Sequence, residues 1–149
     1  MSITGILCYL SIPIGLWAAF LVFWLTETQE SFITNAAILS TAFSMITGPF
    51  WIIYVVYLAI RLIPKLDEIA IPGGPANREY PDSWLARGIS LNSYAGDLMS
   101  ARVRRKDKLA IDFRDQPFPI RLALKVHVYW MCLGALSMLT GFLLFEFAD

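Results

Sequence analysis

Residues 3–25 of the chain read ITGILCYLSIPIGLWAAFLVFWL, a run of 23 residues without a charged side chain. An α-helix of this length, at about 1.5 Å per residue, measures about 35 Å, which exceeds the thickness of a bilayer's hydrocarbon core. A cleaved signal peptide would have a basic segment before the run, a shorter apolar core and a small-residue cleavage site after it. We therefore expect a retained transmembrane helix.

Two further stretches share this character. Residues 31–60 carry no charge, and residues 126–145 contain His127 as their only acidic or basic residue. Over the whole chain 57% of the residues are hydrophobic and 16% are charged, and the mean hydropathy is +0.58. In soluble domains about 45–50% of the residues are hydrophobic and about 25% are charged. The sequence thus predicts an all-α membrane protein with three transmembrane helices.

The segment between the second and third stretches has a different composition, with many Pro, Gly and polar residues. Apolar residues recur at near-helical spacing within residues 83–108, which predicts one or two short amphipathic helices whose apolar side could meet the bilayer surface. The predicted organisation has three parts. They are a transmembrane hairpin at 1–62 with spans of about 3–25 and 33–62, a cytoplasmic, partly amphipathic loop at 63–120, and a third transmembrane helix with a short outer tail at 121–149.

The positions of the basic residues predict the orientation. All twelve Lys and Arg residues lie between Arg61 and Lys125. Because short loops rich in Lys and Arg stay in the cytoplasm, we expect a cytoplasmic N-terminus and a periplasmic C-terminus. The chain has no Arg-rich amphipathic presequence, which favours the bacterial inner (plasma) membrane over a mitochondrial one.

A basic run lies near the end of the predicted loop. Its members are Arg102, Arg104, Arg105, Lys106 and Lys108. Such a run can attract anionic lipid headgroups. The alternative is a solvated charged face of a loop helix. The formal net charge of the whole chain is zero, so nothing draws it to nucleic acid.

Sequence patterns of common enzymes are missing. The chain has no Walker loop, no Gly-x-Ser-x-Gly elbow, no His-Glu-x-x-His and no Cys-x-x-Cys motif, and a single histidine cannot form a multi-histidine metal site. None of the three apolar stretches has an Asp or Glu in its core, which argues against carboxylate-driven ion transport. We therefore expect no catalytic residues and no metal site.

His127 is the one candidate cofactor residue. It follows Arg121 by about 9 Å along the third helix, near the cytoplasmic edge of the hydrocarbon core. There it could ligate haem iron or hydrogen-bond a quinone at a subunit interface. A plain interfacial hydrogen bond is the alternative.

Small residues at helical spacing predict close packing between helices. The candidate packing residues are Gly15, Ala37, Thr41, Ser44, Gly48, Gly134, Ser137 and Gly141, and on the first span Cys8, Ser11 and Ala18 continue the series. Large aromatic residues lie on the opposite faces, and contact with lipid is their main expected role. Cys8 and Cys132 lie at different depths and are expected to be free thiols.

These features predict a non-catalytic integral membrane subunit that scaffolds, anchors or helps assemble a larger inner-membrane complex. Its expected partners are other integral membrane subunits and the lipid bilayer. One alternative is a haem- or quinone-binding anchor subunit of a respiratory or photosynthetic electron-transfer complex. Another is a small pore-former or a membrane immunity protein.

Overall fold

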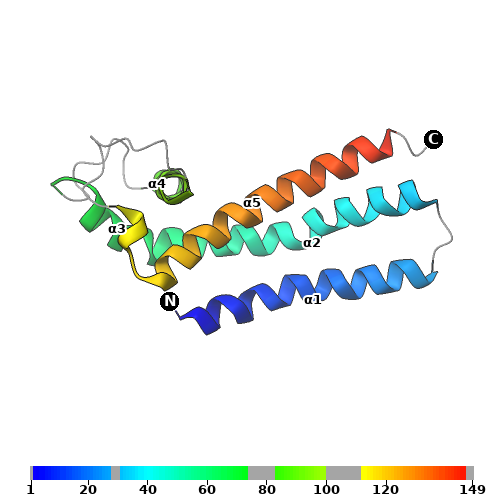
Figure 1. The fold of residues 1–149 in the computed structure, drawn as a ribbon, viewed down its shortest axis with the longest axis horizontal. Coiled ribbons are helices and arrows are strands. Elements are labelled where there is room, and N and C mark those ends of the chain that lie inside the picture. Colours follow the sequence, from blue (N-terminus) through cyan, green and yellow to red (C-terminus); the bar gives the residue numbers. More distant parts are fainter. Residues whose placement is uncertain (1, 28–30, 74–82, 100–111, 147–149) are drawn as a thin grey trace. The chain divides into compact units, whose positions relative to one another are not determined.

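All regular secondary structure in the described part of the chain is helical. The computed structural model describes residues 2–27, 31–73, 83–99 and 112–146. The elements are α1 (Ile3–Glu27), α2 (Phe32–Arg61), α3 (Ile63–Ala70), α4 (Trp84–Met99), the 3₁₀ turn η2 (Phe113–Asp115) and α5 (Phe118–Phe145) (Figure 1). The helices α1, α2 and α5 are long and apolar enough to cross a membrane. The predicted all-α class with three long apolar helices is confirmed.

Local sequence signals explain where the long helices begin. The hydroxyl of Ser31 accepts a hydrogen bond of 3.2 Å from the backbone N–H of Thr34, so that Ser31 caps α2. Pro119 lies in the first turn of α5, where a proline is tolerated because its missing N–H would have no partner within the helix. As a result α5 begins at Phe118, three residues before the predicted boundary, and includes Arg121 and Lys125.

The segment between the second and third apolar helices contains α3, α4 and η2. The helix α3 follows α2 almost without a break, because the N–H of Leu66 donates to the carbonyl of Leu62, and the N–H of Leu62 donates to that of Leu58. Gly73 adopts a φ of 81° in the turn after α3, a conformation that a residue with a Cβ rarely takes. Ser83 caps α4 by accepting a 3.2 Å hydrogen bond from the N–H of Ala86.

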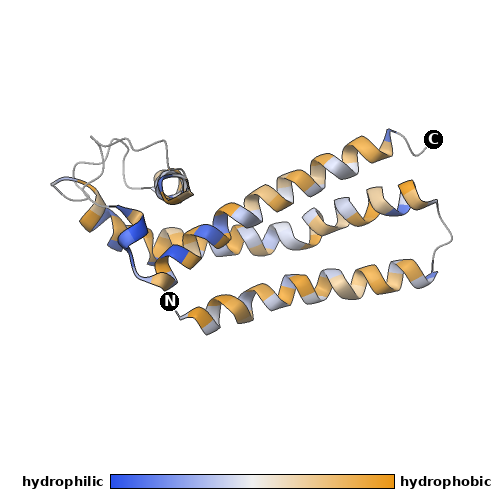
Figure 2. Cartoon of the chain, in the orientation of Figure 1, coloured by the Kyte–Doolittle hydropathy of each residue, from blue (hydrophilic) through white to orange (hydrophobic). Residues whose placement is uncertain are grey.

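The chain forms two compact units. The first contains residues 1–51 and 129–149, and the second contains residues 52–128. The first unit therefore holds α1 with parts of α2 and α5. The second holds the remaining parts of these two helices together with α3, α4 and η2. Polar residues are concentrated in the second unit, on α3, η2 and the first turns of α5 (Figure 2).

In the first unit α2 and α5 pack against each other through hydroxyl groups and small residues. The hydroxyl of Ser44 donates to the carbonyl of Gly134 at 2.8 Å, and that of Ser137 donates to the carbonyl of Ser40 at 2.5 Å. The order of these pairs along the two helices is antiparallel. Each bond satisfies a hydroxyl that would otherwise lie in apolar surroundings, and each requires the two backbones to approach closely.

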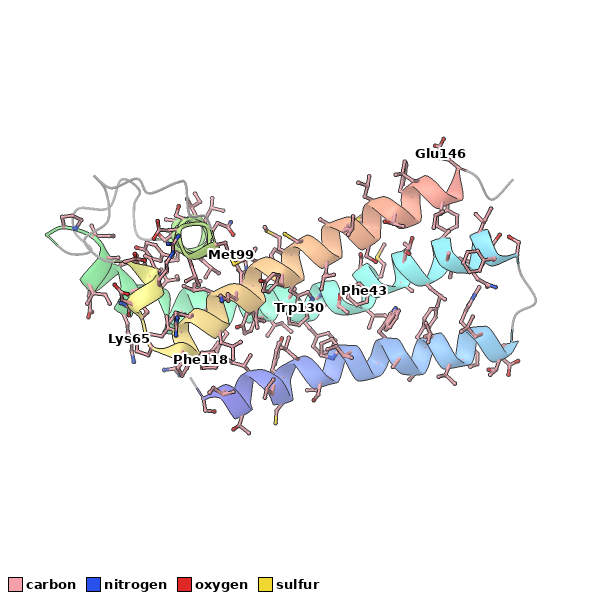
Figure 3. The ribbon with its side chains drawn as sticks, viewed as in Figure 1. Phe43, Lys65, Met99, Phe118, Trp130 and Glu146 are labelled. Carbon is pink, nitrogen blue, oxygen red and sulfur yellow. The ribbon has the colours of Figure 1, made fainter. Side chains whose placement is uncertain are left out.

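The packing of α1 on α2 depends on aromatic side chains. Three of them donate hydrogen bonds across the pair: Tyr9 Oη to Phe50 O at 2.6 Å, Trp17 Nε1 to Leu39 O at 3.4 Å and Trp24 Nε1 to Asn35 Oδ1 at 2.7 Å. The ring of Trp17 also meets that of Phe43 edge to face, with centroids 5.4 Å apart. The ring centroid of Tyr9 lies 6.3 Å from that of Trp130 on α5, which is labelled in Figure 3, so α1 contacts both other helices of this unit.

The structure predicts a difference between two glycines of α5. A Cβ added at Gly141 would lie 3.0 Å from the backbone nitrogen of Thr41 and 3.1 Å from the carbonyl oxygen of Ala37, whereas one added at Gly134 would meet nothing within 4 Å. Backbone atoms cannot move aside as a side chain can. Gly141→Ala should therefore lower the free energy of unfolding by about 1–3 kcal/mol, as overpacking does.

Gly134→Ala is the matched control, because it adds the same methyl group to the same helix. Its effect should stay within about 0.5 kcal/mol. Reversible unfolding of both variants in mixed micelles, followed by circular dichroism, provides the measurement. Equal destabilisation of the two variants would contradict the packing of α2 against α5 at this position.

Candidate functional site

Two fully buried polar residues mark the second unit as the candidate site. Asp67 of α3 has none of its surface exposed, and His127 of α5 has 1%. A buried polar side chain destabilises a fold unless it is hydrogen-bonded, so its partners indicate what it is there for. Both residues have a partner on α4.

Asp67 is bound by Tyr94. The hydroxyl of Tyr94 donates to Oδ1 of Asp67, and Tyr94 itself is 3% exposed. On the other side the ring of Tyr94 stacks on that of Phe113, with centroids 4.6 Å apart and planes inclined by 26°. The carboxylate of Asp112 accepts a 2.9 Å bond from the N–H of Arg114 and so shapes the turn that presents Phe113. One side chain of α4 thus joins α3 to η2.

The amphipathic sequence of α3 explains why Asp67 is buried. Ile63, Leu66 and Ala70 are all buried, at the three-to-four-residue spacing of one helix face, and Asp67 lies on this face. Lys65, Glu68 and Ile69 occupy the exposed side. Asp67 therefore enters the core with its apolar neighbours, and Tyr94 supplies the donor that its carboxylate requires there.

His127 is bound by Asn92. Nε2 of His127 lies 2.8 Å from Oδ1 of Asn92, so that the imidazole N–H donates to the amide oxygen. The bond joins α5 to α4 across 35 residues of sequence. His127 was predicted as a cofactor residue or as the donor of a plain interfacial hydrogen bond. The geometry is that of a hydrogen bond between helices of the same chain, and the haem or quinone role stays a prediction.

A third polar contact joins the parts of α2 and α5 that belong to this unit. The hydroxyl of Tyr54 donates to the carbonyl of Ala123 at 3.1 Å, and both residues are buried. The same parts of the two helices also carry cationic residues. Arg61 and Lys125 are exposed, and Arg121 is half-buried.

This arrangement is suited to holding helices together. Within the residues that the structure describes, no group of three or more His, Cys, Asp or Glu side chains could hold a metal ion. The contacts of Asp67, Tyr94, Asn92 and His127 instead fix the position and the rotation of α4 relative to its neighbours. Sequence reasoning missed Asn92, Asp67 and Tyr94 as members of this cluster. The one feature of the sequence that could have indicated these three residues is that each is polar and lies on an otherwise apolar face of a helix.

The predicted packing residues fall into two groups. Ala37, Thr41, Ser44, Gly134, Ser137 and Gly141 are brought together between α2 and α5. A Cβ added at Gly15 or at Gly48 would meet nothing within 4 Å, so these two glycines do not provide the close packing expected of them within the chain. On α1 the aromatic N–H and O–H donors require acceptors, and α2 supplies them. The need for these acceptors decides which face of α1 turns toward α2.

Other predicted residues are placed as follows. Cys8 and Cys132 are free thiols, as expected, and both are exposed.

The large aromatic residues do not form one class. Phe23 and Phe142 are exposed, but Trp24 and Trp130 pack inside the bundle, where lipid contact was expected. The predicted headgroup residues lie outside the described part of the chain. They are Arg102, Arg104, Arg105, Lys106 and Lys108.

Comparison of the chain with protein-family models, with characterised proteins and with solved structures finds no match. Function must therefore be inferred from the residues and their geometry.

The Tyr94 hydroxyl should stabilise the second unit. Tyr94→Phe keeps the stacked ring but removes the donor to a fully buried carboxylate, so we expect a loss of about 1–3 kcal/mol in the free energy of unfolding. Hydrogen exchange of the α3 and α4 amides measures this loss locally. Tyr57→Phe, at a 44% exposed position of α2, is the control and should change little. Indistinguishable protection in the two variants would refute the role of the Tyr94–Asp67 bond.

The bond between His127 and Asn92 can be measured by a double-mutant cycle with His127→Leu and Asn92→Ala. Hydrogen bonds between membrane helices average about 0.6 kcal/mol and reach about 1.7, and we expect a coupling energy in this range. His127→Gln keeps a donor at similar reach and should be milder than His127→Leu. If the purified protein has a haem absorption band that His127→Gln removes, the residue acts as a ligand instead of an interhelical tie.

Proposed function

We propose that this chain is a non-catalytic integral membrane component that binds another integral membrane protein through the outward face of α1. In this role it scaffolds or helps assemble a larger complex. The proposed location is the bacterial inner membrane with a cytoplasmic N-terminus, because every Lys and Arg of the chain lies between Arg61 and Lys125.

The observation that supports this proposal is the rotation of α1. Its inward face carries Ile6, Tyr9, Pro13, Trp17 and Trp24, which are buried or half-buried. Its small residues are turned outward: Cys8, Ser11, Gly15 and Ala18 are all exposed. The face that would allow the closest approach of another helix is therefore the face that this chain leaves uncovered.

Small residues favour a protein partner over lipid at this face. Two membrane helices gain little from excluding lipid, and their association depends on close van der Waals contact and on hydrogen bonds between backbones that approach closely. The exposed small residues Gly15 and Ser11 offer such contact to a second helix. Other exposed parts of the same unit carry large side chains, such as Phe23 and Phe142, which suit contact with disordered acyl chains.

The pair α2 and α5 provides a comparison within the chain. There the same residue types, with Ser44 and Gly141 among them, bring two helices into direct contact. The small-residue face of α1 has the spacing of 3, 4 and 3 residues that continues along one helix face. We infer that the small-residue face of α1 allows the same direct contact with a partner helix that α2 and α5 make with each other.

This proposal predicts an assembly that depends on Gly15. Extracted in mild detergent from its native membrane, the protein should migrate in a complex much larger than 16.8 kDa. Gly15→Leu should disrupt the complex, because the added side chain keeps the partner helix from approaching the backbone of α1 closely. It should leave the chain itself folded, because a Cβ at Gly15 meets no atom of the chain within 4 Å. Native electrophoresis and sedimentation measure the assembly, and circular dichroism checks the fold.

Ile14→Leu is the matched control. Ile14 is the neighbouring residue and 56% exposed, and the substitution keeps the size of the side chain. It should leave the complex intact. An assembly that tolerates Gly15→Leu, or a monomeric wild-type protein with full cellular function, would defeat the proposal and favour the pore-former and immunity alternatives.

A further inference from the structure

The helix α4 runs across the parts of α2 and α5 that belong to the second unit. Within the second unit α4 is seen end-on, whereas the parts of α2 and α5 that belong to this unit extend across the view (Figure 1). If α2 and α5 cross a bilayer, as the proposed function requires, α4 lies along the membrane plane. This orientation alone does not say how deep α4 lies.

The bond between Asn92 and His127 defines that depth. Asn92 lies near the middle of α4, and His127 is the second residue after Lys125, where the uncharged run 126–145 of α5 begins. Lys and Arg at the end of a membrane helix extend their charged groups to the headgroup level. The middle of α4 is therefore held at the level at which α5 passes from the headgroups into the hydrocarbon.

One face of α4 is uncharged and exposed at this level. It consists of Leu85, Ile89, Asn92, Gly96 and Met99, which fall within about 80° of one another on a helix that turns by about 100° per residue. We call it the interfacial face. The exposed fractions of Leu85, Ile89 and Met99 are 60%, 42% and 40%. The charged residues of the described helix, Arg87 and Asp97, lie on its other side.

The interfacial face is distinct from the apolar face through which α4 packs on the rest of the second unit. Leu91, Tyr94, Ala95 and Leu98 are buried and point toward the core of the second unit. Asn92 lies at the centre of the interfacial face and reaches His127, so this face borders α5 where the uncharged run begins. Met99 lies on the side of α4 toward which α5 runs from Phe118 (Figure 3).

We propose that the interfacial face of α4 contacts the acyl chains of the cytoplasmic leaflet, so that α4 is an in-plane membrane-surface helix. Sixteen residues make a helix of about 24 Å, about twice the diameter of a helix, so α4 is longer than the width of the α5 helix that it crosses. In the same unit Ile53, Val56 and Ile60 of α2 are also exposed apolar residues. The interfacial face is thus a lipid-binding surface, with its depth fixed by the bond between Asn92 and His127.

Site-directed spin labelling of the full-length protein tests this inference. In a background of Cys8→Ser and Cys132→Ser, single nitroxide labels are placed at Leu85, Ile89 or Met99. The protein is reconstituted in nanodiscs of phosphatidylcholine and phosphatidylglycerol. Power saturation compares collisions with oxygen, which concentrates in hydrocarbon, and with a water-soluble nickel complex. All three labels should favour oxygen over nickel.

Two control positions are expected to give the reverse ratio. They are Asp97, on the other side of α4, and Asp115 of η2. A preference for nickel at Leu85, Ile89 and Met99 would overturn the inference in favour of water contact. Labels that neither reagent reaches would overturn it in favour of a protein that covers the face.

A label at Leu136, a 61% exposed residue in the middle of α5, reports on membrane insertion independently. It should favour oxygen. If Leu136 favours oxygen and the three α4 labels do not, the lipid contact of α4 fails while the membrane-spanning role stands. If Leu136 also favours nickel, both proposals fail together.

Discussion

Apolar surroundings supply no hydrogen-bond partners, and this constraint explains most of the contacts between helices in this chain. Each hydroxyl, indole or imidazole donor that lies along a long helix must find an acceptor within the protein. Ser44 and Ser137 find backbone carbonyls between α2 and α5, and Trp24 finds the amide of Asn35 on α2. The positions of these few donors determine which face of each helix turns inward.

The same constraint organises the second unit around α4. A single helix supplies the donor for the buried carboxylate of Asp67 and the acceptor for the buried imidazole of His127. The two bonds leave α4 in different directions, because Tyr94 and Asn92 are two residues apart and so lie on different sides of the helix. A helix held from two sides can neither roll nor slide without losing one bond. This explains how a 16-residue helix keeps one defined face outward.

The sequence allowed prediction of the three long helices, because a charge-free run of about 20 residues or more is long enough to cross the hydrocarbon core and longer than most buried helices of soluble domains. It also indicated close packing through the small residues of all three helices, but not that α2 and α5 form the pair that uses them. For α1 it favoured packing through the small-residue face, whereas in the structure the aromatic face contacts α2. The choice depended on acceptors such as the carbonyl of Leu39 on another helix. The pairs of Asp67 with Tyr94 and of His127 with Asn92 join residues 27 and 35 positions apart, and no spacing rule connects them.

The outward surfaces of α1 and α4 differ in what can cover them. On α1 the exposed face with Cys8, Ser11, Gly15 and Ala18 carries small groups, so lipid chains would leave gaps that a rigid helix could fill. On α4 the exposed groups are long and flexible, as Leu85 and Met99 are, and conformable acyl chains can match them without a fixed complementary shape. A partner of complementary shape binds better than lipid only where the exposed surface is rigid and shallow. We therefore assign the protein partner to α1 and the lipid to α4, because the rigidity of the exposed groups distinguishes the two surfaces although both are apolar.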